Sequence, residues 1–141
     1  MPNENPIYID EKPKLTEFII PKDYATTLIY LAIKIELLNK DWKYAASHII
    51  YLKNEDIYPQ MSPEPEELKL DYAKDLEGKK LRINSHVSRF NFSDEDDAKP
   101  AKVKYNLIIE AGDDLIGDFS VKSGTDNPVD FNCSILFKTE K

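Results

Sequence analysis

The sequence predicts an α+β fold, in which an N-terminal helical layer packs on a C-terminal four-stranded antiparallel β-meander. The chain has 141 residues, the size of one ordinary domain. Apolar residues recur at helical spacing before Gly78 and alternate with polar residues after it. Because an apolar sheet face needs a cover, the helical half is expected to supply one. We therefore expect a single domain over residues 1–141, with an extended lead-in at 1–22, a mainly helical part at 23–77 and an antiparallel sheet at 79–138.

The lead-in holds apolar residues between prolines, and it forms either a short edge strand or a segment that crosses the core. Asp23 follows Pro21 and can cap a helix that runs to about Asn39. Two apolar sets at helical spacing fall on opposite sides of that helix: Tyr24, Leu28, Leu31, Ala32, Ile35 and Leu38, against Ile29, Tyr30, Ile33 and Leu37. A helix that is apolar on both sides is usually buried between two layers.

A second helix is predicted from Asp41 to about Leu52, with a core stripe of Trp42, Ala45, Ala46 and Ile49. The short link between the two helices predicts an αα-hairpin. An acidic, proline-rich connector follows at Asn54 to Glu67. Leu68, Tyr72 and Leu76 then repeat every four residues, which predicts a short third helix. Gly78 stands where a helix C′ glycine is expected.

Strict alternation of apolar and polar residues predicts four strands after Gly78. The stretch "AGDD", Ala111 to Asp114, is a tight turn signal between the second and third of these strands. The positions expected to face the core are Leu81, Ile83, Ser85 and Val87, then Val103, Tyr105, Leu107, Ile109 and Ala111, then Leu115, Phe119 and Val121, and finally Val129, Phe131, Cys133, Ile135 and Phe137.

The overall charge of the chain limits which classes of partner it can bind. A net charge of −7 works against binding to nucleic acid or to an anionic membrane surface, and it suits a protein with a basic patch. The single cysteine excludes an intrachain disulfide and suits a reducing compartment. The start of the chain lacks the basic end and apolar run of a secretory signal, and Tyr24 to Leu38 is too short for a membrane span. We therefore expect a small acidic protein of the cytoplasm.

No catalytic motif stands out. GxSxG, HExxH, P-loop and GxGxxG patterns are all missing from the sequence. His48, His86 and Cys133 do not have the spacing of a zinc site. Cys133 alternates with Phe131 and Ile135, which predicts a packed core thiol. We assign no catalytic residue, no metal and no cofactor. These features favour a protein that is not an enzyme.

The stretch "SDEDDAKP" carries four consecutive acids: Asp94, Glu95, Asp96 and Asp97. Calcium takes such oxygen ligands, but an EF-hand loop begun at Asp94 would place Lys99 where glycine is needed and Tyr105 where glutamate is needed. Three interpretations remain: a solvated hairpin loop, an acidic contact for a partner, or a metal site shared with Asp126 and Asp130. We favour the solvated loop and keep the four acids as candidate partner contacts.

Tyr44, His48 and Tyr51 are spaced by four and three residues, so on the predicted second helix they share one face. That face is turned away from the stripe that includes Trp42. Tyrosine is favoured at protein interfaces because it gives a large and fairly rigid contact area. The three residues are therefore candidate partner-binding residues, with packing against the rest of the core as the alternative.

The function that these features favour is that of a non-catalytic protein-binding domain, such as a small acidic adaptor, an immunity- or antitoxin-type inhibitor, or a phage anti-defence protein. One alternative is a small-ligand pocket protein or enzyme with a helix-covered sheet, its polar groups drawn from Tyr30, Tyr105, His48 and Asp118. Another is a homo-oligomeric structural or assembly subunit, in which the helix Tyr24 to Leu38 packs against a copy of itself.

Because the acidic stretch fails the calcium-loop spacing, we predict that it is not a structural metal site. Replacing Asp94, Asp96 and Asp97 together by asparagine should leave the melting temperature nearly unchanged, in calcium and in chelator alike. Thermal unfolding followed by circular dichroism measures this. A clear drop in the melting temperature of the unmodified protein on adding chelator would contradict the prediction.

Overall fold

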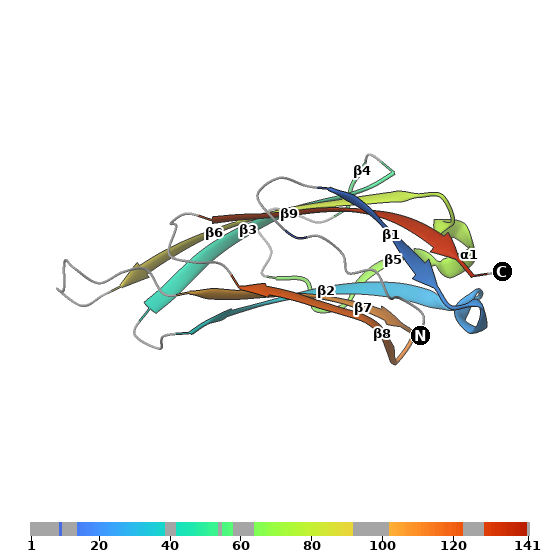
Figure 1. The fold of residues 1–141 in the computed structure, drawn as a ribbon, viewed down its shortest axis with the longest axis horizontal. Helices are drawn as coiled ribbons and strands as arrows, with labels where there is room; N and C mark the ends of the chain where they lie inside the picture. Colours follow the sequence, from blue (N-terminus) through green and yellow to red (C-terminus); the bar gives the residue numbers. More distant parts are fainter. Residues whose placement is uncertain are drawn as a thin grey trace.

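The computed structural model describes residues 9, 14–38, 42–53, 55–57, 64–91, 102–122 and 129–140. Over these residues the chain is nearly all β and forms two sheets packed face to face (Figure 1). The first sheet has the strand order β1-β9-β6-β3-β4, and the second has the order β5-β2-β7-β8. The strands of the first sheet are β1 (Leu15–Ile20), β9 (Val129–Thr139), β6 (Lys80–Asn91), β3 (Trp42–Leu52) and β4 (Glu55–Asp56). Those of the second are β5 (Leu68–Tyr72), β2 (Leu28–Leu37), β7 (Val103–Ala111) and β8 (Asp114–Lys122).

The α+β prediction is wrong, because the described residues contain neither a helical layer nor an αα-hairpin. The predicted first helix is the strand β2, preceded by the 3-10 turn η1 (Lys22–Tyr24), and the predicted second helix is β3. A run that is apolar on both faces satisfies helical and strand spacing equally. The β-branched residues of β2 and the alternation in its "IKIEL" end were the signals that favoured a strand. Tyr24 to Leu38 therefore does not form the helix that was expected to pack against a second copy of the chain.

The third predicted helix is confirmed only in its last part. Its first part is β5, and only α1 (Ala73–Leu76) is helical. Gly78 has φ 77°, the left-handed conformation expected of a C′ glycine. Of the two alternatives for the lead-in, residues 15–20 form an edge strand, β1, which pairs in parallel with β9 from Leu15↔Ser134 onward.

The four C-terminal strands exist, but they do not form one meander. β7 and β8 make the expected hairpin, turning through Gly112, whose φ is 59°. β6 and β9, in contrast, pair with each other in the first sheet. The chain thus changes sheet between β6 and β7 and again between β8 and β9. Alternation tells which side chains face inward, but it does not tell which strands are neighbours. Since no helical layer is present, the two apolar faces cover each other.

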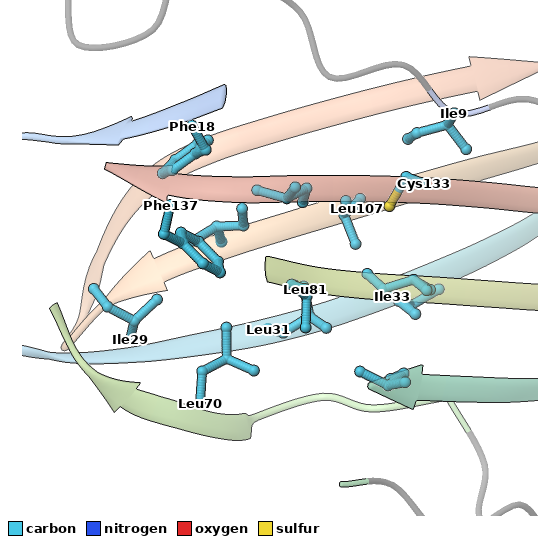
Figure 2. Close-up of a cluster of buried hydrophobic side chains, with 14 of the residues drawn as sticks. Ile9, Phe18, Ile29, Leu31, Ile33, Leu70, Leu81, Leu107, Cys133 and Phe137 are labelled. Atoms are coloured by element: carbon cyan, nitrogen blue, oxygen red, sulfur yellow. The ribbon is translucent and has the colours of Figure 1, made fainter. Parts of the chain in front are cut away.

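The core lies between the sheets, and most of the inward positions predicted for the C-terminal strands are buried there. Figure 2 shows Leu107 and Cys133 among the buried side chains between the sheets, and Phe18 and Phe137 next to each other further along the core. Leu115 is an exception, because it is 58% exposed. The prediction of a core thiol at Cys133 is confirmed: the residue is buried, and burial raises its pKa to about 12.

One lateral side of the sandwich is sealed by an aromatic cluster. Phe18 of β1 is fully buried and packs edge-to-face on Phe119 of β8, with ring centroids 5.9 Å apart. It packs in the same way on Phe137 of β9, at 6.1 Å. A Cβ atom at Gly117 would lie only 2.8 Å from the Phe18 ring, so the missing side chain is what admits the ring. Gly117 therefore lets the edges of the two sheets meet.

None of the helices in the described part of the chain is long and apolar enough to cross a membrane.

We predict that Gly117→Ala lowers the free energy of unfolding by about 1–3 kcal/mol, the usual cost of overpacking a core. The added methyl group must displace Phe18, and this cost exceeds the gain from a less flexible unfolded chain. Chemical denaturation measures it. Ser120→Ala, at an exposed position of the same strand, is the control and should change stability by less than about 0.5 kcal/mol. Equal stability of the two variants would show that Phe18 is not held against Gly117.

Candidate functional site

The side of the sandwich away from Phe18 carries a groove with a volume of about 940 Å³. Its walls come from Ala32–Glu36 of β2, from Ile108 and Glu110 of β7, from Tyr44 of β3 and from residues 64–67. The segment 64–67 is held there because the Ile33 N–H donates a 2.9 Å hydrogen bond to the Pro65 carbonyl oxygen. The groove therefore runs along β2 next to the point where β5 begins.

The lining of the groove is strongly acidic. It includes one lysine, Lys34, and five glutamates: Glu36, Glu64, Glu66, Glu67 and Glu110. Strand alternation places Lys34 and Glu36 on the exposed outer face of β2, and the segment before β5 exposes Glu66 and Glu67. A concave surface lined by one sign of charge concentrates its field, so this groove attracts cationic groups.

A chain of polar side chains runs from the groove into the core. His48 of β3 is only 1% exposed, and its Nδ1 lies 2.7 Å from the Ser85 Oγ of β6. The same oxygen lies 2.8 Å from the Tyr105 hydroxyl of β7, in the opposite sheet. On the groove side, His48 Nε2 lies 3.8 Å from Glu64 Oε1 and has no hydrogen-bond partner among the described residues. The chain thus links the groove wall to both sheets.

Burial sets the protonation of these groups. It lowers the pKa of His48, and the nearby charge of Glu64 offsets only part of this effect, so the imidazole is neutral at pH 7. Burial also raises the pKa of Tyr44 to about 12, helped by the charge of Glu64 and a hydrogen bond to it. The pKa of Tyr105 is likewise raised, mainly by burial. Both tyrosines are therefore neutral hydrogen-bonding groups at neutral pH.

This arrangement does not present a nucleophile to the groove. Ser85 is fully buried, and its hydroxyl is engaged by both His48 and Tyr105. Among the described residues, no three His, Cys, Asp or Glu side chains gather closely enough to hold a metal ion. The groove itself is lined by carboxylates and by apolar side chains.

The structure separates the three residues predicted to share a face. Tyr44 and His48 are both on the inner side of β3, Tyr44 at the groove and His48 in the core. Tyr51 is on the outer side, where the Arg82 guanidinium carbon lies 5.8 Å from its ring centroid. The prediction of one shared face is wrong because on a strand residues share a face only when an even number of positions separates them.

The other predicted groups lie either outside the described residues or at separate places in the sandwich. Asp94, Glu95, Asp96 and Asp97 lie outside the residues that the structure describes, as does Asp126. Of the four polar groups considered for a ligand pocket, His48 and Tyr105 are joined through Ser85 in the core. Asp118, in contrast, accepts a 2.7 Å hydrogen bond from Asn106 at an exposed position, and Tyr30 is half-buried on β2. These four side chains do not surround one cavity.

The sequence did not single out the glutamates that line the groove, nor two residues of the polar chain, Ser85 and Glu64. Ser85 interrupts the apolar register Leu81, Ile83 and Val87, and a polar residue on a buried register needs a partner, so its position was a usable signal. Glu64 was seen only as part of an acidic connector. Its approach to His48 joins positions that are neighbours only in the folded sheet pair, and no sequence pattern encodes it.

Comparison with protein-family models, with curated proteins and with solved structures finds no match for this chain.

We predict that His48 makes the fold sensitive to mild acid. Because the pKa of His48 is lowered in the folded state, the unfolded chain binds more protons once the pH falls below its ordinary pKa of about 6.5. The free energy of unfolding should therefore fall from there towards the folded-state pKa, by up to about 1.4 kcal/mol per pH unit. Below the folded-state pKa of His48, the stability that its neutral imidazole contributes is fully lost, and the free energy of unfolding falls no further on its account.

Denaturation of the wild type and of His48→Gln between about pH 7.5 and pH 5 tests this. The glutamine amide can still bond to Ser85, and the difference between the two proteins should shrink as the pH falls. His86→Gln changes the other histidine, which is exposed beside Asp130, and it should keep the His48-dependent fall in stability. A constant difference between wild type and His48→Gln over this range would refute the role of His48.

Proposed function

We propose that this protein is a non-catalytic protein-binding domain, and that its binding surface is the acidic groove beside β2. The observation that carries the proposal is the lining of that groove, with five glutamates and one lysine. A protein with a basic patch is the partner that such a surface suits. A small adaptor or an inhibitor of another protein would use a surface of this kind.

Two further features support a binding role. Glu36, Glu66 and Glu67 are exposed, so they can meet a partner without rearrangement of the core. Tyr44 adds a half-buried ring at the groove, which gives contact area with little loss of side-chain freedom. Charges of this kind speed association and select against acidic partners, and their effect weakens as salt rises.

The cytoplasmic location stays part of the proposal. Cys133 is the single cysteine of the chain and is present as a free, buried thiol, which suits a reducing compartment.

The groove can be tested against general acidity with two variants of equal charge. One carries Glu36→Gln, Glu66→Gln and Glu67→Gln in the groove. The other carries Glu17→Gln, Asp75→Asn and Asp113→Asn at exposed positions elsewhere. Fluorescence anisotropy of a labelled lysine-rich peptide gives the dissociation constant of each protein.

The groove variant should bind about tenfold more weakly than wild type, which corresponds to about 1.4 kcal/mol, whereas the control variant should bind about as well as wild type. An equal loss in both variants would mean that the peptide responds only to net charge, and the proposal would then fail.

A further inference from the structure

One edge of the strand β2 is only partly paired in the part of the chain that the structure describes. On one side it pairs with β7 along its whole course, from Ile29↔Ala111 to Leu37↔Val103. On the other side it pairs with β5 only as far as Leu31. The bond from the Ile33 N–H to Pro65 continues this contact by one step. Beyond Ile33, no strand of the described residues pairs with this edge, and the groove lies there.

The hydrogen-bond register shows which backbone groups face that edge. The Leu38 N–H donates a 2.9 Å hydrogen bond to the Lys102 carbonyl oxygen, on the β7 side. The Gly112 N–H likewise donates a 2.9 Å hydrogen bond to the Leu28 carbonyl oxygen. Since backbone groups alternate sides along an antiparallel strand, the even-numbered residues of β2 bond to β7. The N–H and C=O groups of Ile35 and Leu37 therefore point to the open side. They form a short row of donors and acceptors along the groove.

Next to Glu64 of the groove, a buried polar group lacks one hydrogen-bond partner among the described residues. His48 is almost fully buried, with Nδ1 bonded to Ser85, and its Nε2 has no hydrogen-bond partner among the described residues. That nitrogen lies 3.8 Å from Glu64, whose carboxylate lines the groove. Among the described residues, the unpaired backbone groups of β2 and the carboxylates thus lie along one groove, with the His48 imidazole beside Glu64.

We propose that the occupant of the groove is an extended, lysine- or arginine-bearing segment of a partner protein, which adds to the open edge of β2 as a further strand. The inference rests on the proposed function and adds the mode of binding to it. Backbone bonds to Ile35 and Leu37 hold the segment, as in other cases of strand addition. Its outward side chains lie alongside Glu36 and the exposed glutamates that precede β5, which select for positive charge.

A second copy of this chain fits the edge poorly. Two β2 edges brought together would oppose Glu36 and its neighbouring glutamates with the same residues of the copy, and each chain carries a net charge of −7. Like charges directly opposite on paired strands are destabilising. A basic segment opposite the same glutamates is instead attracted to them.

The probe is a peptide of about eight residues with alternating lysine and valine, long enough to form one ordinary strand. Two further versions carry N-methyl groups, one on every lysine amide and the other on every valine amide. Methylation removes backbone donors but keeps the side chains and the charge. Because an added strand presents only alternate amides to its neighbour, only one of the two versions should lose binding.

The expected result is that one methylated peptide binds at least about tenfold more weakly than the parent and the other binds about equally well. Loss with methylated valines indicates an antiparallel strand, because bonded residues then share the inner face with Ile35. Loss with methylated lysines indicates a parallel strand.

Equal binding of all three peptides, or equal loss with both methylated versions, would overturn strand addition, while binding of the parent peptide would leave the proposed function standing. No binding of the parent peptide would overturn both proposals. A stable homodimer in sedimentation that excludes the peptide would show instead that the edge is taken by a second copy.

Discussion

The hydrogen bonds that join His48, Ser85 and Tyr105 determine how the two sheets lie on each other. A polar group in a core is costly without a partner, and here one hydroxyl bonds to Nδ1 of an imidazole from its own sheet and to a phenol from the other. A slip of one residue in β6 would turn Ser85 towards solvent. A shift between the sheets would part Ser85 from Tyr105, and would also break the stack of the Tyr105 ring on Phe131, whose centroids are 4.5 Å apart. These contacts therefore favour a single alignment.

That alignment makes the two lateral sides of the sandwich different. On one side Phe18 enters beside Gly117 and closes the gap between β1 and β8. On the other side β5 ends its pairing early, so part of β2 borders a groove. An open edge invites pairing with other chains, and charged side chains are a common protection against it. The glutamates around this edge therefore have two effects: they oppose pairing between copies, and they favour a basic partner.

The sequence predicted the C-terminal half far better than the N-terminal half, for a physical reason. In β7 and β9 one face is polar, so alternation is visible and the inward residues follow from it. In β2 the residues Leu31, Ala32 and Ile33 are all buried, and continuous apolar runs hide the period. Tyr44, His48 and Tyr51 were assigned to one face because a helical period was applied to what is the strand β3. His48 and Glu64 come into contact only when the segments on both sides of the acidic connector fold back on each other. No local sequence pattern predicts this contact.

Between Ile33 and Leu37, β2 is bonded to β7 on one side and has no strand of the described residues on the other. Amide hydrogen exchange of the uncomplexed protein, followed residue by residue by NMR, tests this arrangement most directly. The amides of Lys34 and Glu36, which face β7, should exchange slowly, and those of Ile35 and Leu37 should exchange fast, giving an alternating pattern. Uniform protection of all four amides would contradict the account, because it would mean either that the segment is helical or that this edge is already covered.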